Sequence, residues 1–170
     1  MLTPEVPMSH SVAGEPSSAG RRVAPATTAV YSAAEWDLLT SLPGRVVVAA
    51  TSAGPGRPTR GVAAGVAGLD AVAAGRSSDS DLVRAVVATV YARDDAAPPV
   101  ERLADLVDLL AACRAAVRVL GRRADPADSA AYRQWVQSVA ARVCQAPPAG
   151  SISPADRRLL DRLGTALALR

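Results

Sequence analysis

Apolar residues recur at intervals of three and four along most of this chain, as they do on one face of an α-helix. The longest stripe ends near Arg123, and a second one follows it. The first stripe contains Leu103, Leu106, Val107, Leu110, Cys113, Val117 and Leu120, and the second contains Tyr132, Val136, Val139 and Val143. No alternating strand pattern competes with them. The pattern predicts an all-α protein, a compact bundle or array of about seven helices.

Capping residues and helix breakers divide the chain into these helices. Ser32 and Glu35 form a capping box, in which the hydroxyl and the carboxylate bind the free amides of a helix start. Pro43-Gly44 is predicted to end that first helix, and Asp125-Pro126 supplies an N-cap and a first helical residue for a later one. The predicted helices cover about 32–42, 45–53, 59–75, 78–92, 100–123, 126–146 and 153–167.

The beginning of the chain differs in composition from the rest. Residues 1–28 are rich in Pro, Ser, Gly and Thr and show no periodicity, so we expect a disordered tail followed by a single helical domain over residues 29–170. The tail has no signal-peptide pattern, and the longest uncharged apolar run is too short and too rich in glycine to span a bilayer. These features favour a cytoplasmic protein without membrane association.

The composition excludes several kinds of chemistry. The chain has no lysine, which excludes a P-loop and a Schiff base, and its one histidine, His10, lies in the predicted tail. Cys113 and Cys144 have no metal-ligand spacing and are expected to be buried thiols. We therefore expect no metal and no cofactor. The net charge of +3 is small and the arginines form no block, so nucleic acid is an unlikely partner.

The second and third predicted helices are unusually apolar. Residues 46–53 carry no charge, and a helix that is apolar on every side is usually buried. The third helix contains Gly61, Gly65 and Gly68, each of which costs helix stability on the order of 1 kcal/mol relative to alanine. Small residues of this kind permit close helix contacts. Because two such helices are hard to cover within one chain, we expect self-association or a protein partner, with the third helix at the interface.

Asp70 is the only charged residue between Gly61 and Gly75. On the third helix it lies at the edge of an apolar face made of Val62, Val66, Leu69 and Ala73. Two readings are open. In one, Asp70 lines a cleft, where partial burial would raise its pKa toward that of a general base. In the other, it is a surface acid that gives this helix a polar side.

Arg114 is the strongest candidate for binding an anion. It flanks the apolar stripe of the long helix, where a guanidinium can hold a carboxylate, phosphate or sulfate; alternatively it belongs to a solvated ridge of arginines. The aromatic residues Trp36, Tyr91 and Tyr132 are candidates for lining a small-molecule site, although each also fits simple packing at the core or its rim.

The segment Glu35-Trp36-Asp37-Leu38-Leu39, followed by Pro43 and by Val46 to Ala50, resembles a group of small bacterial helical proteins of largely unassigned function. The resemblance covers residues 33 to 93. Similar small helical proteins occur in actinobacterial natural-product pathways, and one pair of them forms the aziridine ring of azinomycin-type antibiotics by amine attack with loss of a sulfate-type leaving group. That resemblance implies a carboxylate that takes the amine proton, Asp70 or Asp37, and an arginine that holds the departing anion, Arg114 or Arg45.

Two functions therefore remain open from the sequence. The first is a helical accessory or binding subunit of a protein complex, in secondary-metabolite biosynthesis if the resemblance holds. The second is a small cofactor-independent enzyme that uses a carboxylate base and an arginine on a small anionic or zwitterionic metabolite. A deep pocket that joins Asp70 to an arginine would favour the enzyme, and a flat apolar patch over the second or third helix would favour the subunit.

Overall fold

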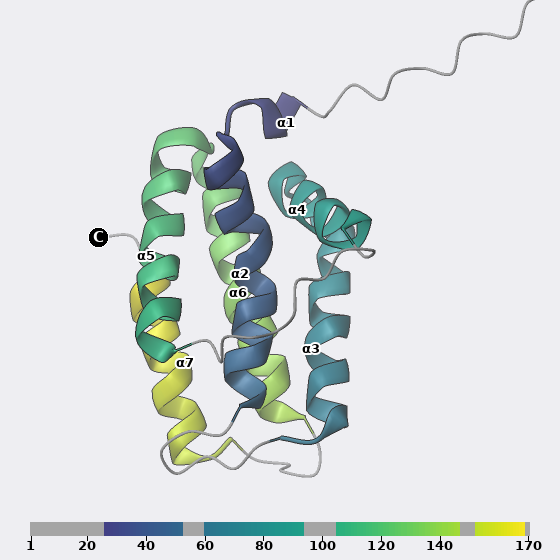
Figure 1. Ribbon diagram of the computed structural model, residues 1–170, viewed down its shortest axis with the longest axis vertical. Coiled ribbons are helices and arrows are strands. Elements are labelled where there is room, and N and C mark those ends of the chain that lie inside the picture. The colour runs from purple at the N-terminus through teal and green to yellow at the C-terminus, as the bar shows by residue number, and fades with distance from the viewer. Residues whose placement is uncertain (1–25, 53–59, 94–104, 147–151, 169–170) are drawn as a thin grey trace, which may run out of the picture.

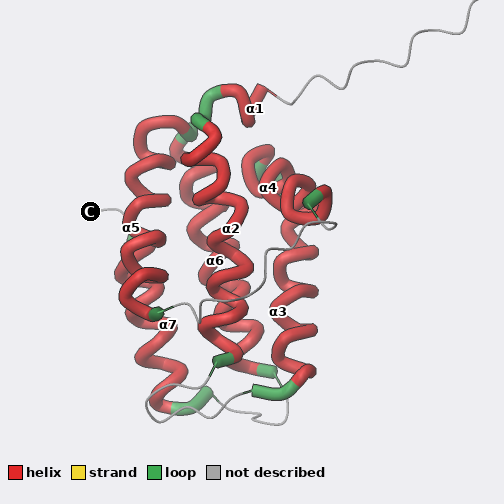
Figure 2. The backbone as a smooth tube through the Cα atoms, viewed as in Figure 1, coloured by secondary structure: helices red, strands yellow, loops and turns green. Residues whose placement is uncertain are grey.

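The computed structural model describes residues 26–52, 60–93, 105–146 and 152–168. Within these ranges it contains helices and no strands, so the predicted all-α class is confirmed (Figures 1 and 2). The helices are α1 (Ala26–Ala29), α2 (Ala33–Thr51), α3 (Val62–Ala74), the 3-10 turn η1 (Gly75–Ser77), α4 (Asp81–Ala92), α5 (Leu106–Arg123), α6 (Pro126–Gln145) and α7 (Pro154–Leu167). No helix in the described ranges is long and apolar enough to cross a membrane.

Helices α2 and α6 form the centre of the bundle. Helix α2 packs against α3, α4, α5 and α6, while α6 also contacts α7. Figure 1 shows α5 and α7 on one side of this central pair and α3 on the other, with α4 at the upper end of α3. The predicted inner face of α6 is confirmed, because Tyr132, Val136, Val139 and Val143 are all fully buried.

Local capping chemistry sets most of the helix starts, as predicted. In the capping box of α2, the Ser32 amide donates to Glu35 Oε2 over 2.9 Å and the Glu35 amide donates to Ser32 Oγ over 3.2 Å. Asp125 caps α6, with Pro126 in its first turn, and Ser153 caps α7 in the same way. These side chains bind amides that have no partner within the helix.

The predicted break at Pro43-Gly44 is wrong, because α2 runs through Pro43 without interruption. Proline has no amide hydrogen, so the carbonyl of Leu39 loses the donor that it would have in a regular helix. The hydroxyl of Tyr132 on α6 donates to that carbonyl over 2.7 Å, and both residues are fully buried. A side chain 93 positions away thus satisfies the carbonyl that Pro43 leaves free.

The tail predicted over residues 1–28 lies outside the described residues except for its last three, which belong to α1. Tyr31, two residues after the end of α1, packs on Trp36 with 5.7 Å between the ring centroids. The first part of the long helix predicted over 100–123 also lies outside the described residues, and α5 begins at Leu106. The number of helices is close to the predicted seven for two reasons that offset each other. The helices predicted over 32–42 and 45–53 are one helix, α2, and the short helix α1 was not predicted.

Candidate functional site

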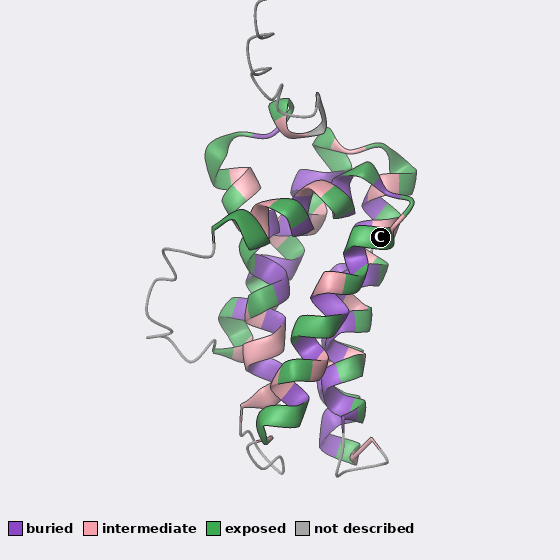
Figure 3. Ribbon diagram, turned by 90° about the vertical axis from the view of Figure 1, so that its right-hand side faces the viewer, coloured by how far each residue is buried: buried purple, intermediate pink, exposed green. Residues whose placement is uncertain are grey.

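The most unusual surface of the described chain is the outer face of α3. Val62, Val66 and Leu69 are 85%, 49% and 60% exposed, and the partly exposed Ala73 continues the same line. We call these four residues the outer stripe. The sequence marked them as the apolar face of the helix, but they point to solvent rather than into the core. Figure 3 views the molecule from the side on which α3 lies in Figure 1.

The inner face of α3 explains this orientation. A Cβ atom at Gly68 would lie 2.8 Å from methyl groups of Val143 and Val47, and one at Gly75 would lie 2.8 Å from Trp135 Nε1. At these two glycines the backbone is therefore so close to its neighbours that even a methyl group would clash. The buried residues of α3 are Ala64, Gly68, Ala71 and Val72, whereas Val62, Val66 and Leu69 face away from the core.

Gly61 and Gly65 do not take part in this close contact. A Cβ atom at either position would meet nothing within 4 Å. Of the three glycines that the sequence suggested for close packing, only Gly68 makes such a contact within the chain. Gly65 instead lies beside the outer stripe and leaves open space there.

An aromatic residue of α4 extends the apolar surface at its upper end. Tyr91 is 36% exposed, and its hydroxyl lies 3.5 Å from the carbonyl oxygen of Leu69. The guanidinium of Arg76 lies 4.1 Å from the centre of the Tyr91 ring, a cation–π contact. Four of the six large hydrophobic residues that are exposed in the described ranges therefore lie on or against α3: Val62, Val66, Leu69 and Tyr91.

Asp70 lies on the flank of the outer stripe and is exposed. It lines an open depression of about 470 Å³ between α3 and α6, together with Arg142 and Gln145, which are exposed as well. The structure thus places an arginine near Asp70, but that arginine is Arg142 of α6, which the sequence analysis did not single out. Ala67, Ala71 and Ala146 form the apolar wall of this depression.

The other charged candidates lie elsewhere. Asp37 on α2 is exposed and forms an ion pair of 2.5 Å with Arg93, which also donates to Thr40. Arg45 is half-buried on α2. Arg114 is exposed on α5, where it lines a depression of about 480 Å³ between α5 and α7 with Asp161 and Arg162. Neither Arg45 nor Arg114 lines the depression that contains Asp70.

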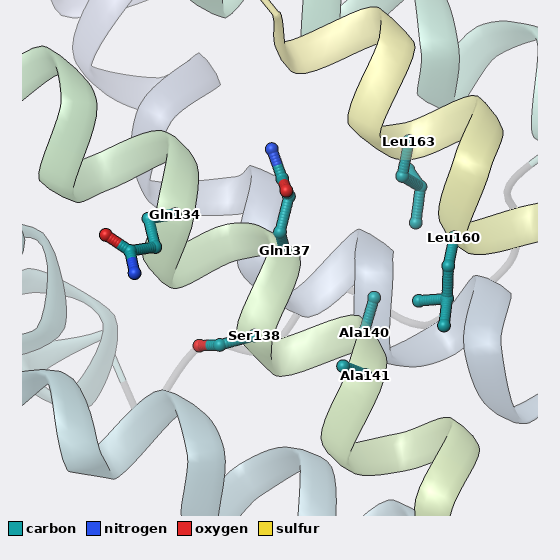
Figure 4. Close-up of a pocket in the computed structure, with 7 residues that line it drawn as sticks. All are labelled: Gln134, Gln137, Ser138, Ala140, Ala141, Leu160 and Leu163. Atoms are coloured by element: carbon teal, nitrogen blue, oxygen red, sulfur yellow. The ribbon is translucent and has the colours of Figure 1, made fainter.

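A further depression of about 300 Å³ lies between α6 and α7 (Figure 4). Its walls combine amide and apolar side chains, namely Gln134, Gln137, Ser138, Ala140, Ala141, Leu160 and Leu163. None of the described residues that line it is ionisable. The Ser138 hydroxyl donates to the Trp135 carbonyl over 2.7 Å, and no acid or base among these residues could activate it.

Two buried groups in the core are kept protonated. Burial raises the pKa of the Cys113 thiol to about 11, although the charges of Arg45 and Arg114 act in the opposite direction. Burial likewise raises the pKa of Tyr132 well above its ordinary value, and its hydroxyl is occupied by Leu39. At neutral pH Cys113 is therefore a poor nucleophile, and Tyr132 serves the fold. Among the residues that the structure describes, no three His, Cys, Asp or Glu side chains gather to hold a metal ion.

In the part of the chain that the structure describes, the fold is an all-α bundle with an uncovered apolar face on α3. No family model, no curated protein and no solved structure matches the chain. The sequence carries one signal for the orientation of α3 that hydrophobic periodicity does not capture. Ala64, Gly68, Ala71 and Gly75 repeat with spacings of four, three and four, which marks a face of small residues suited to close packing.

Proposed function

We propose that this chain is a binding subunit that docks another protein chain on the outer stripe of α3. The observation that carries the proposal is the exposure of Val62, Val66 and Leu69 on a single helix face. Single exposed apolar residues are common on soluble proteins, but a contiguous apolar surface usually marks an interaction site. Complete transfer of a fully exposed Val or Leu side chain out of water is worth about 1.5–3 kcal/mol, before the costs of association are subtracted.

A pair of matched substitutions tests the proposal. Val66→Arg places a charge in the outer stripe, and Val107→Arg places the same charge at the exposed Val107 of α5, away from α3. Because both valines are exposed, both variants should fold like the parent, as judged by circular dichroism and thermal unfolding. The wild type and Val107→Arg, immobilised, should retain the same bound chain from an extract of the source organism, and Val66→Arg should lose it. Equal retention by all three proteins would contradict the proposal.

The second candidate is a small cofactor-independent enzyme, and the observation that favours it is the depression shared by Asp70 and Arg142. In the ring closure implied by the resemblance, an amine nitrogen attacks the carbon that carries a sulfate group. The carbon–oxygen bond breaks, the amine proton passes to Asp70, and Arg142 holds the released sulfate. We rank this function second because both side chains are exposed, so that water screens their charges.

Ligand binding tests the second candidate independently of docking. Small amino-alkyl sulfates should raise the melting temperature of the parent, and Asp70→Asn and Arg142→Met should each abolish that rise. The matched control is Arg118→Met on α5, which removes an exposed arginine elsewhere on the surface. No rise in the parent, or the same rise in Arg142→Met, would exclude this site for such ligands.

A further inference from the structure

We propose that the depression between α5 and α7 binds a small molecule that carries one carboxylate on an apolar body. This site is independent of the proposed docking on α3, because α5 and α7 lie on the other side of the central helix pair (Figure 1). Its volume of about 480 Å³ is typical of small-molecule sites. Its walls come from both helices, with Val107, Leu110 and Arg114 on α5 and Asp161, Arg162 and Thr165 on α7.

Two guanidinium groups from different helices line this depression. Arg114 lies on α5 and Arg162 on α7, and these helices pack directly against each other. Both side chains are exposed, and neither forms an ion pair within the described part of the chain. Their N–H donors are therefore available to a ligand. A guanidinium presents a planar fork of donors that matches a carboxylate, which accepts two parallel hydrogen bonds from it.

The charges in the walls favour a ligand with a single negative charge. Asp161 lines the depression beside the two arginines, so the walls carry a net charge of one positive unit. One carboxylate on the ligand neutralises this charge. Any further negative charge would be repelled by the carboxylate of Asp161. The depression is therefore matched to a monoanion.

The α5 side of the depression changes from apolar to basic along the helix. Val107, Leu110 and Arg114 are spaced by three and four positions, so they share one helix face. Val107 is 69% exposed and Leu110 is half-buried, so both offer apolar surface to a ligand. The helical rise places Val107 and Arg114 about 10 Å apart along the axis. A carboxylate held at Arg114 therefore leaves space for an apolar body of similar length over Leu110 and Val107.

The two other depressions described above lack this combination. The one between α3 and α6 joins Asp70 to a single arginine, Arg142. The one between α6 and α7 has no ionisable side chain among the described residues that line it. Of these three, the α5–α7 depression alone places apolar surface beside two free guanidinium groups. It is therefore the one suited to an anion with an apolar body.

Titration of the full chain with phenylbutyrate, followed by NMR, tests the site. The backbone amide signals of residues 107–114 and 161–165 should shift with ligand concentration and reach saturation. Phenylbutyramide has the same body without the charge, and acetate has the charge without the body. Each of them should bind at least about tenfold more weakly than phenylbutyrate, because it lacks either the charged hydrogen bonds or the apolar contact.

Matched substitutions test the role of each charge. Arg114→Met and Arg162→Met should each weaken phenylbutyrate binding about tenfold. Arg118→Met, which removes an exposed arginine of α5 outside the depression, should leave binding nearly unchanged. Asp161→Asn should strengthen binding, because it removes the carboxylate that repels the ligand. All four positions are exposed, so circular dichroism should show the same fold in every variant.

The outcomes separate binding in this depression from general attraction to a basic surface. A wild type that shows no saturable shift overturns the proposal, and so does equal binding of phenylbutyramide. An equal loss in Arg118→Met and Arg114→Met would mean that only the net surface charge attracts the ligand, and it would overturn the site as well. Val66→Arg on α3 should bind phenylbutyrate like the wild type, so a failure of docking on α3 would leave this proposal unaffected.

Discussion

Helices α2 and α3 are both strongly apolar, yet the bundle covers one on several sides and the other on one face. Helix α2 directs Leu39, Leu42 and Val46 into the core, and four other helices pack around it. Helix α3 directs Ala64, Gly68, Ala71 and Val72 inward and leaves Val62, Val66 and Leu69 in solvent. The comparison shows that hydrophobicity alone does not decide which face of a helix is buried. The distance between the backbones decides which side chains fit.

Each of the two helices also contains residues that normally weaken a helix, and the structure treats them differently. Pro43 in α2 removes an amide from the core, and the Tyr132 hydroxyl replaces it. Gly68 in α3 needs no replacement, because the missing side chain is what lets α2 and α6 approach. Pro43 removes a hydrogen-bond donor that a distant side chain replaces, whereas Gly68 is required by the close packing of the helices. Substitutions at these points should separate the two cases.

The largest loss of stability is expected when the buried ion pair just before α3 is broken. Arg60, which follows the α2–α3 connection, pairs with Asp156 of α7 over 2.5 Å, and their side chains are only 13% and 3% exposed. Asp156→Asn should lower the free energy of unfolding by about 3–5 kcal/mol, because it leaves a largely buried guanidinium without its counter-charge. Urea denaturation measures the loss. Asp161→Asn, at an exposed position of the same helix, is the control and should change stability by no more than about 0.5 kcal/mol.

The second largest loss of stability is expected when the hydrogen bond from Tyr132 to the Leu39 carbonyl is removed. Tyr132→Phe removes the hydroxyl that donates to the buried Leu39 carbonyl and should cost about 1–3 kcal/mol. Pro43→Ala restores a backbone amide to that carbonyl, so adding it to Tyr132→Phe should recover part of the loss. A double-mutant cycle by urea denaturation measures this coupling. Strictly additive effects of the two substitutions would contradict the account of Pro43.

The two faces of α3 should respond in opposite directions to the same small change. Gly68→Ala forces a methyl group against Val47 and Val143, whose branched side chains are stiff, and should destabilise the protein by about 1–2 kcal/mol. Gly65→Ala adds a methyl group in open space and should stabilise α3 by up to about 1 kcal/mol. Thermal unfolding of the two variants beside the wild type compares them. A loss of stability at both positions would mean that Gly65 is also packed within the chain.

These cases show which parts of the fold the sequence could predict. The capping box at Ser32, the N-cap at Asp125 and the inner face of α6 depend on residues close together in the chain, and all three were predicted correctly. The continuation of α2 through Pro43 depends on Tyr132, which is distant in sequence, and no local pattern contains that information. The orientation of α3 depends on the volume available between α2 and α6, which hydrophobic periodicity does not encode.

For the candidate site too, features set by nearby residues could be predicted, and features set by contacts between distant segments could not. That Asp70 lies at the edge of an apolar face follows from helical spacing, and the structure places it there. That Arg142 lines the same depression follows from the packing of α3 on α6, which the sequence alone does not reveal. Asp37 is similar, because its partner Arg93 lies 56 positions away at the end of α4.

The smallest expected effect compares the starts of the two helices. Helix α2 has a capping box, whereas Gly61 at the start of α3 makes no side-chain cap. The backbone amide of Ser32, then Arg122 and Arg123, lower the pKa of Glu35 below its ordinary value of 4.5. A carboxylate with a lowered pKa in the folded state stabilises the protein above its unfolded pKa, and this contribution is lost as the pH falls through the folded value. Thermal unfolding from neutral pH downward should therefore show stability falling below about pH 4.5 in the wild type, with a smaller fall in Glu35→Gln. Arg122→Met should reduce the slope less than Glu35→Gln does, since the Ser32 amide contributes more. An unchanged slope in Glu35→Gln would mean that the capping box does not link the start of α2 to pH.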